Sequence, residues 1–184
     1  GWGFMNDLET PLAQDQIDSI LNFVSFERGS HHQVDFQDAE ITVTKSNPNF
    51  KLDFNAIAQG LSVDVIYDFI EKKGCKNFYV EIGGELKVKG HNKNGTPWNI
   101  AVDSPIENLQ TRERDTIIHI SDKAIATSGN YRKFYVKDGI KYSHTLNPST
   151  GKPVTHSLLS ATVIANMCST SDAFATAFMV MGTE

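Results

Sequence analysis

Between residues 77 and 165 the chain repeats one pattern, in which short runs of β-branched and aromatic residues are separated by glycine-containing turns. These turns fall at Gly83-Gly84, Asn94-Gly95, Asp138-Gly139 and Thr150-Gly151. The Asp138-Gly139 pair lies between two aromatic-rich runs and is a strong hairpin signal. The pattern predicts strands at residues 77–82, 85–89, 98–102, 116–120, 124–127, 131–136, 141–146 and 159–165.

Three segments with helical periodicity or continuous apolar character accompany these strands. They are residues 11–26, residues 55–73 and the stretch from Ser169 to Gly182. Residues 33–45 alternate instead, as a strand, a turn and a second strand. The sequence therefore predicts an α+β fold of mixed, largely antiparallel sheets flanked by a few helices. The apolar face predicted for the second helix consists of Ile57, Leu61, Val65, Ile66, Phe69 and Ile70.

Composition narrows the class of protein. With 184 residues, 40% of them hydrophobic and 21% charged, the chain resembles one ordinary globular domain. Its net charge of −5 comes from interspersed acidic and basic residues, which argues against a nucleic-acid partner. No apolar run approaches the ~20 residues that span a bilayer, and no signal-peptide pattern opens the chain. Cys75 and Cys168 have no Cys or His at metal-binding spacing, so we expect two free, partly buried thiols.

The predicted last helix is almost continuously apolar, but Asp172 and Thr176 interrupt it four residues apart. Side chains at this spacing lie one above the other on a helix face. An unpaired carboxylate in apolar surroundings is costly, and a hard cation such as Mg²⁺ would suit a carboxylate beside a hydroxyl. The alternative is that Asp172 only caps the first turn of its own helix, as Ser169-Thr170-Ser171 also could. Taken alone, the helix favours the cap.

Two further segments place polar or glycine residues where the chain changes direction. From Asp53 to Gly60 an extended segment becomes a helix, whose N-terminus could receive a phosphate. The segment Glu81-Ile-Gly-Gly-Glu85 would let the backbone approach a ligand closely. Each has a structural alternative, a helix cap by Asp53 or Asn55 and a tight hairpin respectively. In isolation these alternatives are favoured.

Two more segments carry residues with catalytic or binding chemistry. Residues 126–132 end in Arg132, which could pair with a phosphate or form a structural ion pair. Residues 142–153 place His144 in a turn crowded with hydroxyl groups. Histidine side chains can act as general bases near neutral pH, although a lone histidine is more often structural. No G-x-S-x-G elbow is present, so a serine-hydrolase triad is not expected.

The order and spacing of these segments resemble the ApbE family, the FAD:protein FMN transferases formerly called thiamine-biosynthesis lipoproteins. The resemblance runs from Trp2 to Gly182 and implies a single ApbE-like, T-fold-like domain over residues 1–184. The matching motifs are Asp53-x-x-Ala-Ile-Ala-Gln-Gly60 with Asp64, Ile82-Gly-Gly-Glu85, Ala126-Thr-Ser-Gly-Asn-Tyr-Arg132, Tyr142-Ser-His-Thr-Leu-Asn-Pro-x-Thr-Gly-x-Pro153 and Ser171-Asp-Ala-x-Ala-Thr176.

The resemblance implies an activity and a set of site residues. Family members bind FAD with Mg²⁺ across its pyrophosphate and transfer FMN to a threonine or serine hydroxyl of an acceptor flavoprotein subunit, with release of AMP. By motif, Asp172 and Thr176 would be metal ligands through their side chains and Ala56 through its backbone carbonyl. His144 matches the proposed general base. The positions implied to contact FAD are Asp53, Gln59 and Leu146, with Glu81, Gly83 and Gly84 as further candidates.

The chain also departs from the family pattern. Asn147 replaces the usual Asp, and Gln59 replaces the commoner Lys, so cofactor contacts should change in charge. Compared with the family, we expect a domain that lacks the usual segment before Trp2 and the usual end after Gly182. Without these segments, apolar sheet surface would be exposed, and this would favour association as a homodimer. The family is exported and usually lipid-anchored, which implies a periplasmic or cell-envelope location at the inner membrane. No signal or anchoring cysteine precedes the domain in this chain.

Two other functions remain open at this point. One is Mg²⁺-dependent FAD pyrophosphatase activity, with water as the acceptor and FMN and AMP as products. The motifs scarcely separate it from transfer, because both reactions need the same metal and pyrophosphate geometry. The other is a non-catalytic flavin-binding remnant, which the missing ends favour.

Overall fold

The computed structural model describes residues 12–24, 32–37, 40–48, 50–105, 114–130, 134–137 and 140–183. Tertiary contacts divide the chain into two compact units. The smaller consists of Gly1–Asp53 with Leu146–Pro153, and the larger of Phe54–Thr145 with Val154–Glu184. Among the described residues, no helix is long and apolar enough to cross a membrane.

The smaller unit combines one helix with two short hairpins. Strands β1 and β2 pair antiparallel, with Val34 opposite Val43, as the alternating pattern predicts. Ile17 of α1 is buried, and its side chain lies against Gly151 in the turn between β10 and β11. The elements of this unit are α1 (Gln14–Leu21), β1 (His32–Gln37), β2 (Glu40–Lys45), β10 (Leu146–Asn147) and β11 (Lys152–Pro153).

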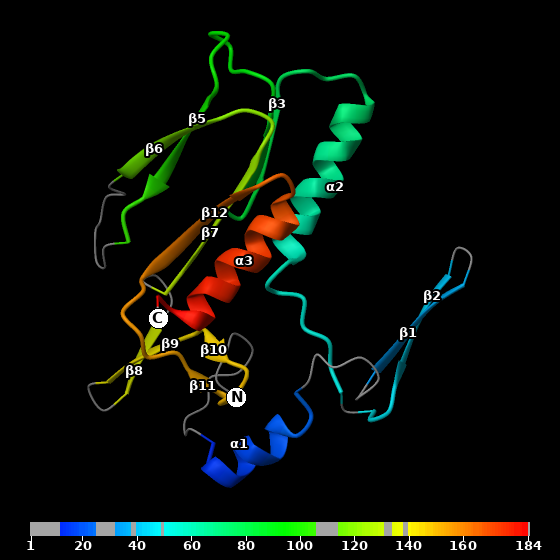
Figure 1. Cartoon of the computed structure of the whole chain (residues 1–184), viewed down its shortest axis with the longest axis vertical. Coiled ribbons are helices and arrows are strands. Elements are labelled where there is room, and N and C mark those ends of the chain that lie inside the picture. Colours follow the sequence, from blue (N-terminus) through cyan, green and yellow to red (C-terminus); the bar gives the residue numbers. More distant parts are fainter. Residues whose placement is uncertain are drawn as a thin grey trace. The chain divides into compact units, whose positions relative to one another are not determined.

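The larger unit is built on a four-stranded antiparallel sheet with the strand order β12-β7-β4-β3. Helices α2 and α3 pack against each other and against this sheet, and β5–β6 and β8–β9 form separate hairpins (Figure 1). The predicted α+β class is confirmed. The elements are α2 (Ala58–Lys72), β3 (Phe78–Ile82), β4 (Glu85–Lys89), β5 (Trp98–Asp103), β6 (Arg114–Ile120), β7 (Ala124–Gly129), β8 (Phe134–Lys137), β9 (Ile140–Ser143), β12 (Ser160–Ala165) and α3 (Cys168–Met181).

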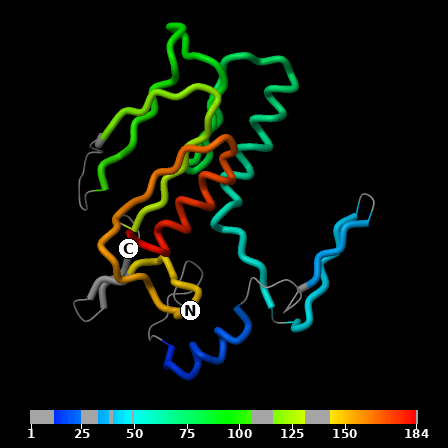
Figure 2. The backbone as a smooth tube through the Cα atoms, viewed as in Figure 1, coloured from blue at the N-terminus to red at the C-terminus, as the bar shows by residue number. Residues whose placement is uncertain are grey.

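The two faces of the sheet have different partners. Because successive side chains of a strand point to opposite faces, the pairing of Lys87 with Val80 and Ala124 places these residues on one face. This face packs against the helices through a cluster that includes Val63, Tyr67 and Val80. The opposite face, which carries Leu86, packs against the β5–β6 hairpin in a second cluster. The backbone tube shows the helices together on their side of the sheet (Figure 2).

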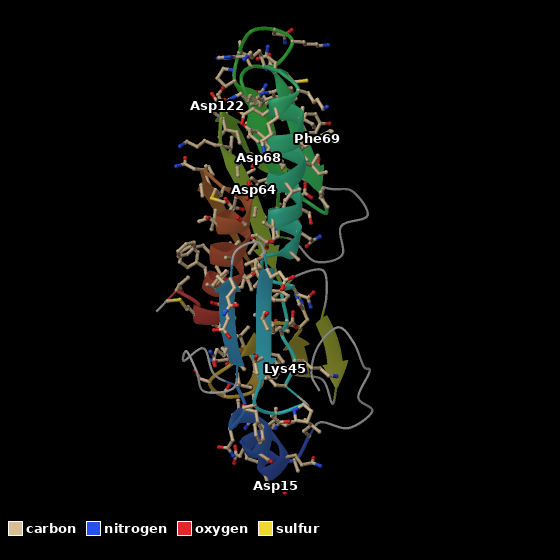
Figure 3. The ribbon with its side chains drawn as sticks, turned by 90° about the vertical axis from the view of Figure 1, so that its right-hand side faces the viewer. Asp15, Lys45, Asp64, Asp68, Phe69 and Asp122 are labelled. Atoms are coloured by element: carbon tan, nitrogen blue, oxygen red, sulfur yellow. The ribbon has the colours of Figure 1, made fainter. Side chains whose placement is uncertain are left out.

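The apolar face predicted for α2 is wrong for four of its six residues, whereas Ile70 packs against the core cluster and Ile57 is half-buried. Leu61, Val65 and Phe69 are 50%, 59% and 59% exposed, whereas Val63 and Tyr67 are buried. Figure 3 places Asp64 and Phe69 on different sides of the helix. The helix is apolar around more than one side, and its buried side is the one where Gly60 and Asp64 meet α3. The side of α2 that contacts α3 thus carries a small residue, Gly60, and a charged residue, Asp64. A search for apolar residues alone cannot identify this side.

Candidate functional site

The N-terminus of α3 is held by a carboxylate from α2. Asp64 Oδ1 accepts hydrogen bonds from Cys168 N at 3.0 Å and Lys87 Nζ at 2.9 Å, and Asp64 Oδ2 accepts from Ser169 N and Ser169 Oγ. Burial alone would raise the pKa of Asp64, but these hydrogen bonds outweigh it and lower the pKa. Asp64 is thus a fully engaged anion, which caps the first turn of α3.

The reverse contact runs from α3 to α2. Asp172 is 4% exposed, and its Oδ2 accepts a hydrogen bond from Gly60 N, in the first turn of α2, at 2.9 Å. The hypothesis that Asp172 caps its own helix is therefore wrong, because α3 begins at Cys168 and Met167 precedes it with no side-chain cap. The carboxylate serves the other helix instead.

The close contact between α2 and α3 is sterically possible because residue 60 is a glycine. A β-carbon at this position would lie 2.5 Å from the carbonyl oxygen of Cys168 and 2.8 Å from Cβ of Asp172. Any larger residue would push α3 away from α2, because backbone and stiff side-chain atoms block the space. The glycine thus sets the separation of the two helices at the site.

Thr176 lies one helical turn beyond Asp172, as the sequence predicts. Its Oγ1 shares a hydrogen bond of 3.2 Å with Ser128 Oγ at the end of β7. Sequence reasoning treated residues 126–132 as important for Arg132, which lies outside the described residues, and missed Ser128. The signal that could have found Ser128 is its place in the same motif, at the end of a predicted strand.

The β3–β4 turn brings a second carboxylate to the helix face. Gly83 and Gly84 have positive φ angles of 69° and 113°, as a two-residue hairpin turn requires. A β-carbon at Gly83 would collide with Gln59 Nε2 and lie 3.4 Å from Glu85 Oε2. Gln59 and Glu85 therefore converge on one point. Glu85 belongs to the predicted motif, but its side chain was not predicted to take part in the site.

Both buried carboxyls of this region resist ionisation. Desolvation raises the pKa of Asp172, against the opposing hydrogen bond from Gly60 N. Desolvation also raises the pKa of Glu85 to about 7; its own backbone N–H opposes the shift, and the charges of Asp172 and Glu81 add to it. The two groups contrast with Asp64, whose pKa is lowered by its partners. Anionic charge is therefore under-compensated around Asp172 and Glu85.

His144 lies in the short segment after β9, between two anchored residues. Ser143 is buried and its Oγ accepts a hydrogen bond from Thr145 N at 2.9 Å. Thr145 Oγ1 donates to Asn130 Oδ1 at 2.7 Å, and Asn130 N donates to the carbonyl of Leu159. The backbone on both sides of His144 is thus fixed by hydrogen bonds.

The remaining predicted residues fall in three places. Asp53 and Leu146 belong to the smaller unit. Ala56 lies in the turn that precedes α2. Glu81 and Gly84 line an open cleft of about 620 Å³ on the other face of the sheet, between β3 and β5. The structure therefore brings Gln59, Gly83, Asp172 and Thr176 to the helix face and leaves Glu81 on the opposite face.

Cys168 takes part in this arrangement through its backbone, and the two thiols have no role in it. Both cysteines are free, which confirms the expectation of free thiols. Cys168 is buried, but Cys75 is exposed, so the expected partial burial is wrong for Cys75. Burial raises the pKa of the Cys168 thiol to about 12, so it stays protonated and packs as a small core residue.

Comparison of the chain with known proteins identifies its family. The model of the ApbE family matches residues 1–184. The chain belongs to the ApbE family. It is 43% identical over 143 residues to a FAD:protein FMN transferase of Vibrio cholerae, covering 78% of this chain and 42% of that protein. It is 32% identical over 186 residues to the protein of the same name from Escherichia coli, covering 100% of this chain and 51% of that protein.

Solved structures of the ApbE family share the fold. The flavin transferase ApbE from Vibrio cholerae has a TM-score of 0.78 and 35% identity, over 97% of this chain and 54% of that chain. The ApbE protein from Thermotoga maritima has a TM-score of 0.80 and 30% identity, over 98% of this chain and 56% of that chain. The chain thus spans about half the length of the relatives that it matches.

Proposed function

We propose that this chain carries the flavin-transfer site of a Mg²⁺-dependent FAD:protein FMN transferase. The observation that carries the proposal is the buried Asp172, held at the N-terminus of α2 one helical turn from the Thr176 hydroxyl. The positive end of a helix dipole attracts anionic groups such as a pyrophosphate. The names of the relatives indicate the reaction.

The surroundings of Asp172 suit a hard cation. Gly60 N donates to its carboxylate, and the ion pairs of the described residues involve Asp64 and Glu71 instead. A buried carboxylate without a counter-charge is costly, so we assign Asp172, Thr176 and the Ala56 carbonyl to Mg²⁺. Mg²⁺ prefers octahedral coordination, so three protein oxygens would leave its other positions for phosphate oxygens and water. When bound, Mg²⁺ would neutralise charge on the pyrophosphate.

Transfer also needs a proton acceptor. The acceptor hydroxyl oxygen bonds to the FMN phosphorus, the anhydride P–O bond breaks, and AMP leaves with the electrons of that bond. We assign the hydroxyl proton to His144, on the family resemblance and on its place in a backbone segment fixed by Ser143 and Thr145. A base that is held in position lowers the entropic cost of reaching the reactive geometry. Gln59 is assigned to FAD, together with Asp53 and Leu146, on the resemblance alone.

The partners and location rest on the resemblance too. The proposed acceptor is a flavoprotein subunit with a threonine or serine at its flavinylation site. The proposed location is the outer face of the inner membrane, and a homodimer is proposed from the exposed apolar residues.

The test incubates the 184-residue chain with FAD, Mg²⁺ and such an acceptor subunit, and measures covalent flavin by in-gel fluorescence and AMP by chromatography. A chelator and the variant Asp172→Ala are the controls. Covalent flavin with equimolar AMP, lost in both controls, supports transfer. FMN and AMP without covalent flavin would instead establish the pyrophosphatase. Metal-dependent FAD binding without turnover would establish a non-catalytic flavin-binding domain.

A further inference from the structure

The buried carboxylate of Glu85 has no evident structural task. Glu85 is 7% exposed, and its Oε2 has no hydrogen-bond partner among the described residues. Buried polar atoms are nearly always paired, and the exceptions mark strain, catalysis or a missing ion or water. The other buried atom of this kind is a neutral hydroxyl, Ser121 Oγ. Glu85 is therefore the one place where a buried charge-bearing oxygen in the described part of the chain lacks a partner.

Asp64 shows what a structural carboxylate looks like in the same pair of helices. It receives two backbone N–H groups, a hydroxyl and the Lys87 ammonium. Glu85 lies two residues from Lys87 on the same face of β4, yet the ammonium of Lys87 pairs with Asp64 and lies 4.3 Å from the centre of the Tyr67 ring. Lys87, the nearby cationic side chain, thus pairs with Asp64 and not with Glu85.

The unpaired oxygen lies near the first turn of α2, the turn that Asp172 contacts. Glu85 Oε2 lies 3.4 Å from the position that a β-carbon on Gly83 would take, and Gln59 Nε2 lies even nearer to that position. The next residue, Gly60, donates to Asp172. The two carboxyls therefore lie near consecutive residues of the first turn of α2, Glu85 near the side chain of Gln59 and Asp172 at the backbone of Gly60. The charge of Asp172 also contributes to the raised pKa of Glu85. Neither has a basic side chain as a partner in the described part of the structure.

We propose that Glu85 is a further cation-binding residue, which forms with Asp172 a paired-carboxylate site for a hard divalent cation. This inference rests on the proposed function, whose metal site it extends by one oxygen ligand. Two buried carboxyls without counter-charge repel each other, and a divalent cation between them removes that repulsion and supplies the partner that Glu85 Oε2 lacks. Gln59 reinforces the arrangement, because its neutral amide adds no positive charge that would compete with a cation.

The test measures Mn²⁺ binding to the whole chain by electron paramagnetic resonance, with Mg²⁺ as competitor, with and without FAD. The variants are Glu85→Gln, which keeps the shape, Glu85→Asp, which keeps the charge, and Asp172→Asn. Glu71→Gln is the matched control, because Glu71 forms a surface ion pair with Lys89 away from the site. We expect Glu85→Gln to weaken binding by about 10-fold or more, in the range seen when groups that support a metal site are removed. Glu85→Asp should lose less, and Glu71→Gln nothing.

The outcomes separate this inference from the proposed function. Binding that is lost in Asp172→Asn but unchanged in Glu85→Gln overturns the role of Glu85 and leaves the metal site of Asp172 intact. Absence of binding by the unsubstituted chain, with and without FAD, overturns both. The melting temperature without metal is the check on folding. Glu85→Gln should not lower it, since the variant replaces an unpaired carboxyl by an amide, and a loss of several degrees would instead indicate a structural role.

Discussion

Replacing Gly60 by alanine tests the helix contact on which the site depends. In an ordinary helix the change would stabilise the protein by up to about 1 kcal/mol, because alanine has the higher helix propensity. Here the new β-carbon would lie 2.5 Å from the Cys168 carbonyl oxygen, whereas ordinary contacts begin at 3.4 Å, so α3 would have to retreat by roughly 0.9 Å. Overpacking of this kind costs about 1–3 kcal/mol.

The retreat would also stretch hydrogen bonds between the helices. The bond from Gly60 N to Asp172, at 2.9 Å, is made to a carboxylate, and such bonds contribute about 1.5–3 kcal/mol each. Set against the gain in helix propensity of up to about 1 kcal/mol, we expect a net loss of about 1.5–5 kcal/mol.

Urea unfolding followed by circular dichroism measures this loss. Ser62→Ala is the matched control, because Ser62 is exposed in the same helix and its hydroxyl bonds only to the Ala58 carbonyl. The control should change stability by less than about 1 kcal/mol. A Gly60→Ala variant as stable as the unsubstituted chain would refute the close contact of the helices.

Further predictions concern the caps and the proposed chemistry. Asp64→Asn should destabilise the chain by about 3–5 kcal/mol in urea unfolding, because it leaves the largely buried Lys87 ammonium without its partner; an effect below about 1 kcal/mol would contradict this. Because the folded-state pKa of Asp64 lies below its ordinary 3.8, its contribution is complete above that value and is lost as the pH falls through the folded-state pKa. The acid unfolding curve of Asp64→Asn should therefore lack this part of the transition. Thr176→Val should weaken Mg²⁺ binding by about 10-fold in calorimetry while Ser128 keeps its place on β7. His144→Ala should depress flavin transfer more than FAD binding, and a parallel loss of both would exclude its role as the base.

The sequence predicted those features that depend on neighbouring residues. The Gly83-Gly84 and Asp138-Gly139 turns each join antiparallel strands, with Ile82 opposite Glu85 and Lys137 opposite Ile140, although residues 138–139 lie outside the described residues. Asp172 and Thr176 share a helix face because their spacing is fixed by the helix itself. Such features need no knowledge of the tertiary fold.

What the sequence could not reveal depends on contacts between distant segments. Asp64 and Cys168 are 104 residues apart, and Ser128 and Thr176 are 48 apart. The spacing of residues along the chain does not reveal that an aspartate in one helix caps the N-terminus of a different helix. For this reason the cap hypothesis placed Asp172 at its own helix instead of α2. The buried side of α2 was missed for the same reason. That side is defined by Gly60 and Asp64, which contact α3, and not by the side with the most apolar residues.

The two aspartates show how one packing arrangement can serve both stability and binding. Each helix sends a carboxylate to the N-terminus of the other, yet Asp64 receives four donors and Asp172 receives one backbone N–H. A carboxylate has about four acceptor sites, so Asp64 has no capacity left, and its task is to fix α3. Asp172 is 4% exposed and accepts a single hydrogen bond from the described residues, so it keeps acceptor capacity for a further ligand. The rigid contact made by Asp64 thus holds in place a second carboxylate that is short of partners, which is the condition that a metal-binding residue must meet before its ligand arrives.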